Sequence, residues 1–391
     1  MSMPVIKLQR NLRKSLLQGH PWVYREALRE PPDSPRAGLC LIKDSQGDFI
    51  GWGLYSPEGP LSVRMLSLEK KAPTSDFFQA RLRRALQLRQ SLIQQGHTTC
   101  YRLVNGEGDL LPGMICDVYH RTAVMQFDGL GPHQFWDSEW LAQWLLHHTE
   151  VERVYLKPRH DLIKTKGIEP QCWGKPLDQP QVAVKENNCH FMVDIVSGQK
   201  TGFFLDQRDN RHYLQFLARG KRVLNLFSYS GGFSIYAGRG EARHVTSVDI
   251  SAGALALAQH NWKLNSLPPE DHRIEVADVF EYIEQTSEQF ELIICDPPSL
   301  AKSEKQKAQA QQTYTQLFAQ AARRVAPGGD LILSSCSSHI DFQDFEQIVS
   351  EALSKARRRG QVLRVSGQGF DHPYPHCLPQ MRYLKFYHLV L

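Results

Sequence analysis

The sequence predicts an α/β protein whose C-terminal part is a doubly wound, mostly parallel sheet, preceded by a small β barrel and an α+β middle domain. Three observations lead to this prediction. The 391 residues are too many for one ordinary core. Strand-like runs fill the first 72 residues, and from about residue 185 apolar runs alternate with segments long enough for helices. We therefore expect domains at 1–72, 73–184 and 185–391.

Turn residues separate the strands expected in the first domain. The run 39–42, the turn 44–47 and the run 49–55 predict a hairpin, and 61–66 continues the β pattern after a Pro-Glu-Gly-Pro turn. Short strands with tight turns are typical of a small barrel.

The middle domain opens with an amphipathic helix from Ser75. Its polar side is expected to carry Arg81, Arg83, Arg84 and Arg89. The expected strands are 101–104, 113–119, 122–127 and 151–156. A helix is expected over 134–148, and the Pro-, Gly- and Lys-rich stretch 157–180 is expected to be a loop.

Strands and helices then alternate in the C-terminal domain. The expected strands are 222–227, 244–250, 273–276, 290–295 and 330–336. Helical crossovers such as 251–265 and 305–325 make these strands parallel and buried on both faces. Two last strands, 361–366 and 383–391, have no helix between them, so the final strand is expected to run antiparallel.

Composition excludes several classes of protein. No apolar run is long enough to span a membrane, and residues 1–10 have no export signal. The eight cysteines are irregularly spaced without a Cys-x-x-Cys pair, which argues against disulfides and zinc. We expect a soluble cytoplasmic protein without a metal.

Positive charge is concentrated at the N-terminal end. Residues 1–90 hold 15 Lys and Arg against 8 Asp and Glu, whereas the rest of the chain carries a slight negative excess. A basic module on a near-neutral body is typical of nucleic-acid binding, because neutralising phosphates releases counterions. An ordinary solvated surface is the alternative.

Ligands of a doubly wound sheet bind beyond the carboxyl ends of its strands. The first strand there ends in the turn Asn225–Phe233, where Gly231 and Gly232 allow the backbone to approach a ligand. The candidate residues of this turn are Asn225, Phe227, Ser228, Tyr229, Gly231, Gly232 and Phe233. Neither a Gly-x-Gly-x-x-Gly fingerprint nor a P-loop is present, so a nucleoside without phosphates is favoured.

Acidic residues follow the next two strands. Asp249 lies at the distance along the chain from the Gly-containing turn at which a carboxylate accepts hydrogen bonds from ribose hydroxyls. Ser251 follows two residues later. Asp278 follows the third strand, where it can meet an adenine amino group. Each acid could instead be a helix N-cap. Together with the Gly-containing turn, they resemble the S-adenosylmethionine site of class I methyltransferases.

The fourth and fifth strands end in groups that could react. Cys295-Asp-Pro-Pro298 fixes Asp296 at the mouth of the site, while Cys336 would lie beside it if the strands are adjacent. Methylation at carbon 5 of a pyrimidine needs a thiolate that first adds at carbon 6. Cys336 could instead be a small, buried apolar side chain, and this is the favoured interpretation of Cys295.

These motifs carry a family resemblance over the whole chain. Residues 200–211, the turn 225–233, Cys295-Asp-Pro-Pro and Ser335-Cys-Ser resemble the bacterial 23S ribosomal RNA large-subunit cytosine-5 methyltransferase I family. Gly19–Tyr24 resembles the start of its RNA-binding PUA barrel, and residues 104–113 resemble its middle domain.

The resemblance implies a seven-stranded Rossmann-like class I domain that uses S-adenosylmethionine on ribosomal RNA. The turn 225–233 would hold the methionine portion, Asp249 the ribose and Asp278 the adenine. Gln207 and Arg211 would help seat the amino-acid end. Asp296 would line the cofactor site and hydrogen-bond a flipped cytosine, while Cys336 would attack it.

RNA contacts are expected from Lys14, His20, Trp22, Arg81 and Arg84. Ser299 stands where many RNA cytosine-5 methyltransferases have a second cysteine, which leaves product release by a second thiol unexplained.

Three alternatives stay open at this stage. The target could be another RNA base atom, such as a guanine nitrogen, or the chain could be a non-catalytic RNA-binding assembly factor. The segment 200–211 could be a helix N-terminus packed on the sheet, with Phe203, Phe204 and Leu205 as core. The oligomeric state is also open, a homodimer being one option.

Overall fold

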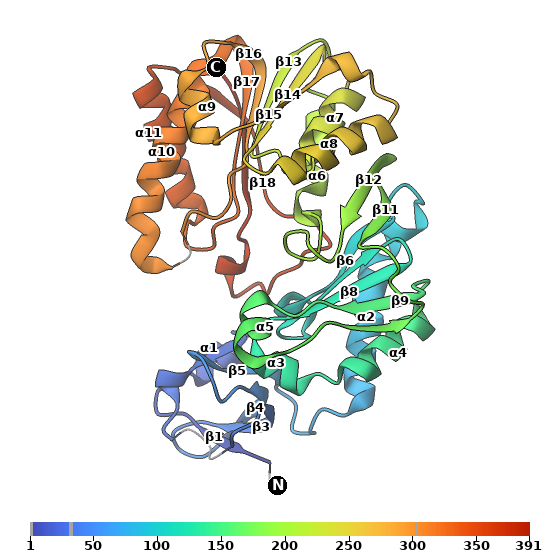
Figure 1. The fold of residues 1–391 in the computed structure, drawn as a ribbon. Coiled ribbons are helices and arrows are strands. Elements are labelled where there is room, and N and C mark those ends of the chain that lie inside the picture. Colours follow the sequence, from blue (N-terminus) through green and yellow to red (C-terminus); the bar gives the residue numbers. More distant parts are fainter. Residues whose placement is uncertain (1–2, 31–33, 302) are drawn as a thin grey trace. The chain divides into compact units, whose positions relative to one another are not determined.

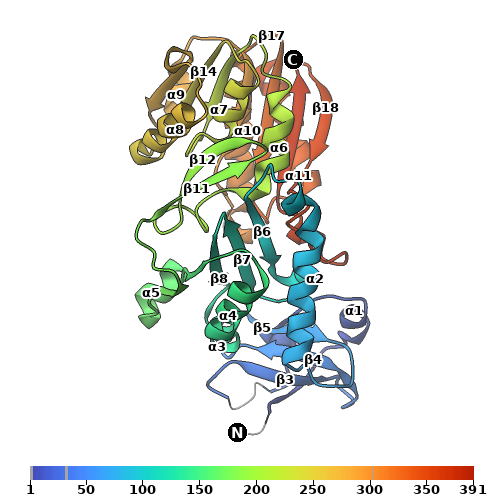
Figure 2. The same ribbon diagram turned by 90° about the vertical axis from the view of Figure 1, so that its right-hand side faces the viewer.

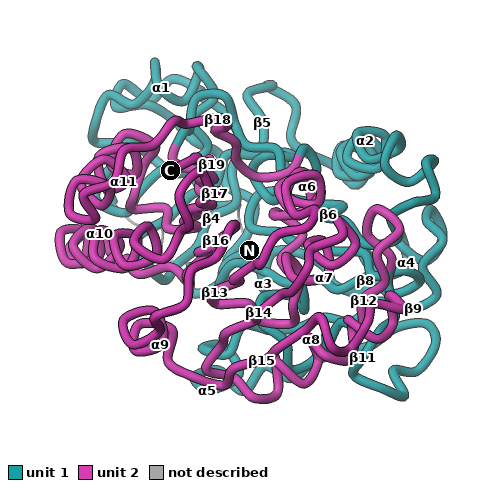
Figure 3. The backbone as a smooth tube through the Cα atoms, turned by 90° about the horizontal axis from the view of Figure 1, so that it is seen from above, with its two compact units in different colours: residues 1–184, 193–203, 370–379 teal, residues 185–192, 204–369, 380–391 magenta. Residues whose placement is uncertain are grey.

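The computed structural model describes residues 3–30, 34–301 and 303–391 (Figure 1). The chain forms two compact units, coloured separately in Figure 3. Unit 1 comprises Met1–Val184, Val193–Phe203 and Phe370–Pro379. Unit 2 comprises Lys185–Met192, Phe204–Gly369 and Gln380–Leu391.

The first sheet of unit 1 has five strands in the order β1-β3-β4-β5-β2. The strands are β1 (Val5–Lys7), β2 (Trp22–Tyr24), β3 (Gly38–Lys43), β4 (Phe49–Tyr55) and β5 (Leu61–Ser67), with the helix α1 (Arg13–Leu17) and the 3-10 turn η1 (Arg25–Ala27). The predicted β3–β4 hairpin is confirmed. Its turn forms because Asp44 Oδ1 accepts hydrogen bonds from the backbone N–H groups of Gln46 and Asp48.

The second sheet of unit 1 has the order β10-β9-β8-β7-β6. Its strands are β6 (Cys100–Asn105), β7 (Met114–Tyr119), β8 (Thr122–Phe127), β9 (Arg153–Leu156) and β10 (Gln171–Gly174). The helical segments of this part are α2 (Ser75–Gln94), η2 (Gly106–Asp109), α3 (Leu130–Phe135), α4 (Ser138–His148) and α5 (His160–Lys166). Leu82 of α2 and Leu141 of α4 are buried in the same core as Val118 of β7.

Three expectations about this region are wrong. The helix predicted over 134–148 is interrupted at Trp136 and restarts at Ser138, because Asp137 accepts the Trp140 N–H and caps α4. The stretch 157–180 is not only a loop, since it contains α5 and β10. Arg89 lies on the buried side of α2, where its guanidinium is bidentate to Asp109.

Two short strands, β11 (Gln181–Glu186) and β12 (Cys189–Asp194), form a two-stranded sheet, seen as adjacent arrows in Figure 2. Asn187 and Asn188 at the turn between them have φ of 47° and 64°. Asparagine tolerates the left-handed region better than most residues, which suits this two-residue connection.

The main sheet of unit 2 has seven strands in the order β15-β14-β13-β16-β17-β19-β18. They are β13 (Arg222–Leu226), β14 (His244–Asp249), β15 (His272–Val276), β16 (Phe290–Cys295), β17 (Val325–Ser335), β18 (Gln361–Ser366) and β19 (Lys385–Val390). The first five strands run parallel, and β19 runs antiparallel between β17 and β18, as predicted for the final strand.

Helices cover both faces of this sheet. They are α6 (Arg208–Gln215), α7 (Gly232–Arg239), α8 (Ala252–Leu264), α9 (Val279–Gln285), α10 (Lys307–Arg324) and α11 (Phe342–Ala356), with 3-10 turns η3 (Leu205–Gln207), η4 (Pro269–Asp271), η5 (Glu304–Gln306) and η6 (Pro379–Met381). Helices α9, α10 and α11 gather on one face and α6, α7 and α8 on the other (Figures 1 and 3). Leu224, Ile293 and Leu331 of the central strands are fully buried, as expected for a sheet covered on both sides.

The chain adds strands in opposite directions from β13: β14 and β15 lie on one side of it, and β16 and β17 lie on the other. At such a switch point, the connections leave toward opposite faces and open a crevice at the carboxyl ends. The fold therefore directs the ends of β13, β14, β16 and β17 to one edge of the sheet.

Candidate functional site

The turn after β13 has an unusual backbone. Phe227 and Tyr229 have φ of 57° and 48°, and Gly231 has φ of 80°. Left-handed conformations cost free energy for residues with a Cβ and concentrate at functional sites. The Ser228 N–H donates to Val248 O of β14 at 3.0 Å, which fixes the turn against the neighbouring strand.

Gly231 is required by packing as well as by its backbone conformation. A Cβ at this position would lie 2.8 Å from the Cβ of Ala258 on α8. A Cβ on Gly232 would lie 3.1 Å from Cδ of Arg211. Phe233, the next residue, is buried and stacks with Phe386 at a centroid distance of 6.5 Å, so its ring belongs to the core of unit 2.

Two buried polar atoms of this turn have no partner among the described residues, Asn225 Oδ1 and Ser228 Oγ. The amide nitrogen of Asn225 is satisfied by Ser234 Oγ at 2.9 Å. Buried polar atoms are nearly always hydrogen-bonded in folded proteins. A polar ligand bound beside this strained turn would supply the hydrogen bonds that the two oxygens lack.

Asp249 is held in place by the backbone. Its Oδ2 accepts the Tyr229 N–H and its Oδ1 accepts the Ser251 N–H, both at 2.9 Å. Each carboxylate oxygen has two acceptor positions, so both can accept a further hydrogen bond. Ser251 itself caps α8 by accepting the Ala254 N–H.

Asp278 is the N-cap of α9. Its Oδ1 accepts the N–H groups of Phe280 and Glu281 at 2.7 and 3.3 Å. The helix-cap interpretation is therefore correct for one oxygen of this residue. Its other oxygen accepts no hydrogen bond from the part of the chain that the structure describes, so capping leaves room for a ligand contact.

Gln207 connects two strand ends. Its Nε2 donates to Asp296 Oδ2 after β16 and to Ser334 Oγ on β17, both at 3.0 Å. Its Oε1 accepts from Asn210 Nδ2 at 2.7 Å, and Asn210 in turn accepts from Ser366 Oγ. This buried chain of amides orients the Asp296 carboxylate.

The two cysteines near the ends of β16 and β17 differ in their exposure to solvent. Cys295 is fully buried within β16, and burial raises its thiol pKa well above the ordinary value. Cys336 is partly exposed and follows β17, the direct neighbour of β16. Asp296 and Cys336 therefore follow adjacent parallel strands.

Arg211 is already engaged by a carboxylate. Its guanidinium is bidentate to Glu186 at 2.8 and 2.7 Å, and both side chains are buried. Tyr236 also donates to Glu186. Arg211 therefore lies next to Gly232 as part of a paired network.

The residues expected to contact RNA lie in unit 1 and differ in surroundings. Lys14 and Arg84 are exposed. Trp22 Nε1 donates to Glu107 at 2.8 Å, and His20 Nδ1 lies 3.1 Å from Trp22 O. Arg81 donates to Leu66 O and Leu110 O, and burial lowers its pKa to about 10. An RNA contact of these five residues stays a prediction.

Sequence reasoning missed several residues that bond to the predicted site residues or to their direct neighbours. They are Glu186, Asn210, Ser334 and Lys385. Ser334 could have been noticed because it begins the polar run after an apolar strand. Asn210 lies within the segment 200–211, but its bond to Gln207 becomes visible only in the fold, and Glu186 and Lys385 belong to strands outside the parallel part of the sheet.

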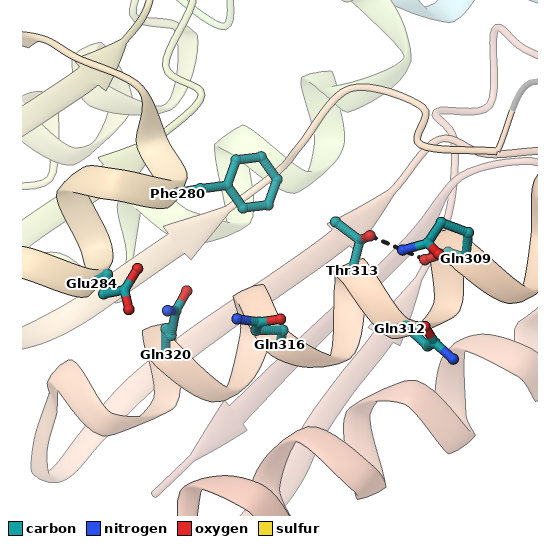
Figure 4. A pocket seen from close by; sticks show the side chains of 7 residues that line it. All are labelled: Phe280, Glu284, Gln309, Gln312, Thr313, Gln316 and Gln320. Atoms are coloured by element: carbon teal, nitrogen blue, oxygen red, sulfur yellow. Dashed lines mark hydrogen bonds between the residues drawn. The ribbon is translucent and has the colours of Figure 1, made fainter.

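Unit 2 also has a polar pocket of ≈ 200 Å³ between α9 and α10 (Figure 4). Its lining residues are Phe280, Glu284, Gln309, Gln312, Thr313, Gln316 and Gln320. Phe280 packs edge-on against Phe227 at 5.9 Å, but the pocket includes none of the predicted catalytic or cofactor-binding residues.

Comparison with known proteins places this arrangement in a family. A PUA-like domain model matches residues 6–68, and an S-adenosylmethionine-dependent methyltransferase model matches residues 160–357. The ribosomal RNA large subunit methyltransferase I of Alteromonas mediterranea is 37% identical over 394 residues, covering 98% of each chain. The protein of the same name from Pseudoalteromonas translucida is 34% identical and covers 97% of each chain. The chain belongs to the ribosomal RNA large subunit methyltransferase I family.

A solved structure from Streptococcus mutans, provisionally named as an S-adenosylmethionine-dependent methyltransferase, has the same fold. It superposes with a TM-score of 0.87 over 100% of each chain at 23% identity. The predicted combination of a PUA-like domain and a Rossmann-like methyltransferase domain is confirmed.

The cofactor of the family is S-adenosylmethionine, as predicted. The site fits this molecule: Asn225 and Ser228 offer unsatisfied buried oxygens, and Asp249 and Asp278 offer acceptors at the next two strand ends. Within residues 3–30, 34–301 and 303–391, no group of three or more His, Cys, Asp or Glu could hold a metal ion. No helix in those same ranges is long and apolar enough to cross a membrane.

Proposed function

We propose that this methyltransferase acts on carbon 5 of a cytosine in large-subunit ribosomal RNA, through a covalent adduct with Cys336. The observation that carries the proposal is the pairing of β16 with β17, after which Asp296 and Cys336 follow on neighbouring strands. The names of the relatives support large-subunit ribosomal RNA as the substrate. Cys336 supports carbon 5 of cytosine as the methylated atom.

The chemistry of cytosine explains why a thiol is needed. Carbon 5 is a poor nucleophile until an electron pair is added at carbon 6. The Cys336 thiolate forms a bond to carbon 6, and carbon 5 then takes the methyl group. Loss of the carbon 5 proton to a base and expulsion of the thiolate restore the aromatic ring. S-adenosylmethionine, when bound, supplies the methyl group as an electrophilic sulfonium.

In this proposal Asp296 acts on the base ring. A protonated or hydrogen-bonded cytosine N3 accepts the electron pair displaced by thiol addition, which lowers the barrier to the adduct. Gln207 positions Asp296 by donating to Oδ2. The turn 225–233 with Asp249, Ser251 and Asp278 is proposed to hold the cofactor, and Arg211 to support that turn through Gly232.

We further propose that the PUA-like domain, assigned to residues 1–72, and the middle domain, assigned to 73–184, bind RNA for the catalytic domain at 185–391. The basic excess of residues 1–90 supports this division of labour.

A 5-fluorocytosine at the target position tests the proposal, because fluorine cannot leave as a proton does. Bisulfite mapping of ribosomal RNA, with and without the protein, first identifies the methylated position. Incubation with a fluorinated transcript and cofactor should then give an RNA–protein adduct, which peptide mass spectrometry assigns to Cys336. Cys336→Ala should give none, whereas Cys295→Ala serves as the matched control and should still be trapped.

Two results would contradict the proposal. Methylation by Cys336→Ala at the wild-type rate would favour direct attack by a ring nitrogen such as that of guanine. An adduct on Cys295 or Cys377 would assign the nucleophile to another residue.

A further inference from the structure

Lys385 is a fully buried cation at the start of β19, with 0% of its surface exposed. It stands opposite Ser335 in the antiparallel register of β17 and β19. Its Nζ donates to Ser337 O at 2.6 Å and to Tyr383 O at 2.7 Å. The ammonium group is thereby anchored to the residue that directly follows Cys336.

Burying such a group is costly unless a negative charge compensates it. The lysine is not within ion-pair distance of a carboxylate in the described parts of the chain, and two backbone carbonyls only partly replace water. Burial accordingly lowers the pKa of Lys385 to about 8. Lysines are almost never fully buried unless they are paired.

The groups that act electrostatically on Lys385 come from the end of β17 and the start of α11. The thiol of Cys336 is the strongest of the favourable ones, followed by Asp341 and Asp344. Both aspartates have other partners, since they form the capping box of α11 and Asp344 also pairs with Lys307 at 2.7 Å.

Two further polar groups on neighbouring elements affect the charge balance around the thiol. Tyr314 of α10 accepts a hydrogen bond from Ser335 Oγ, and burial raises its pKa, so its hydroxyl stays neutral. Tyr314 is within electrostatic range of both Cys336 and Asp296. Asp296 follows β16, the neighbouring strand, and an ionised carboxylate there would oppose ionisation of a nearby thiol. Lys385 lies on β19, the other neighbour of β17, and a cation there would offset this effect.

We propose that Lys385 is a positioning residue whose buried ammonium group stabilises the thiolate form of Cys336. The inference rests on the proposed function, because it explains how that nucleophile is kept reactive beside a carboxylate. Lys385 does not contact substrate in this proposal. It acts through the backbone at Ser337 and through its charge, and the thiolate in turn stabilises the buried cation.

The inference can be tested without RNA, by alkylating the full-length protein with iodoacetamide across a pH series and following each cysteine by peptide mass spectrometry. In Lys385→Met, which keeps the length of the side chain but not its charge, Cys336 should react about threefold to tenfold more slowly at pH 7. Lys385→Arg should retain most of the wild-type rate. The exposed Cys172 of unit 1 is an internal reference that should not change.

Lys221→Met is the matched control, because Lys221 pairs with Asp330 in the middle of β17, six residues before Cys336, and the substitution should leave the alkylation of Cys336 unchanged. An unchanged pH profile of Cys336 in Lys385→Met would overturn the inference. If that variant does not fold, the wild-type protein provides the test: the alkylation midpoint of Cys336 should lie below the ordinary thiol pKa of about 8.5, and an equal or higher midpoint would refute the inference. Trapping of cytosine on Cys336 is measured separately, so failure of the proposed function remains distinguishable.

Discussion

Asp249 and Asp278 follow neighbouring strands but have different bonding capacity left for a ligand. Asp249 uses one acceptor position on each oxygen to hold the turn at Tyr229 and the start of α8. Asp278 uses Oδ1 for both cap bonds. Structural and ligand-binding roles are therefore compatible in each residue, because a carboxylate offers about four acceptor positions.

Replacing Asp249 by alanine should weaken S-adenosylmethionine binding by about 1.5 to 3 kcal/mol, the range for losing a hydrogen bond to a charged group. Calorimetric titration measures this directly. Glu270→Gln, at an exposed position in η4, is the control and should bind normally. Normal affinity together with a lowered melting temperature in Asp249→Ala would assign the residue to the turn alone.

At the scale of elements, α7 and α8 constrain the turn 225–233, which we propose to hold the cofactor. Gly231→Ala should lower both cofactor affinity and melting temperature, because the added methyl group meets Ala258 at 2.8 Å and the left-handed φ of 80° disfavours alanine. Gly253→Ala is the matched control within α8, since nothing lies within 4 Å of its added Cβ. It should be neutral or stabilising by up to about 1 kcal/mol. Equal effects of the two substitutions on cofactor affinity and melting temperature would show that the turn can shift to accommodate the added methyl group.

The packing of α8 on β15 makes stability depend on pH. His272 stacks on Trp262 at 4.4 Å and bonds to Ser247, and burial, with the nearby His244, lowers its pKa to about 4 from the ordinary 6.5. A base whose pKa is lowered by folding makes its full contribution to the free energy of unfolding at pH values above the pKa that the same residue has in the unfolded chain. That contribution is lost as the pH falls from 6.5 toward 4.

Acidification from pH 7 to pH 5 should therefore lower the free energy of unfolding by about 2 kcal/mol through His272. Urea denaturation at the two pH values measures the difference, and His272→Gln should reduce it even if the variant is less stable overall. An identical pH dependence in wild type and variant would contradict the assignment.

Sequence patterns were sufficient for some elements and not for others. The alternation of apolar runs predicted the parallel strands and the late antiparallel strand, because both depend on local hydrophobicity and on helix length. The break at Asp137 and the burial of Arg89 depend on a cap and on a distant carboxylate, which no local pattern contains. Strand-end acids could likewise be found by position, whereas the bridge from Gln207 to Asp296 requires the fold.

At the scale of the whole molecule, charge and chemistry are divided along the chain. The basic excess belongs to residues 1–90, in unit 1, while the strand-end turn, Asp296 and Cys336 belong to unit 2. Substitutions of exposed basic residues in unit 1 should therefore affect RNA affinity without affecting cofactor affinity. Arg81 and Arg89 are unsuitable for such a test, because both are bonded within unit 1 and their removal would disturb its packing.

Lys14 and Arg84 are exposed and suit the test. The double substitution Lys14→Gln and Arg84→Gln should weaken binding of a large-subunit RNA transcript. It should also reduce the slope of log affinity against log salt by roughly 0.7 to 0.9 for each phosphate that the protein no longer neutralises. Filter binding at several salt concentrations measures both quantities. Lys263→Gln, at an exposed position of α8 in unit 2, removes one charge as a control and should leave the slope unchanged. Because counterion release depends on the number of neutralised phosphates and not on sequence, an unchanged slope in the double variant would mean that other residues hold the RNA.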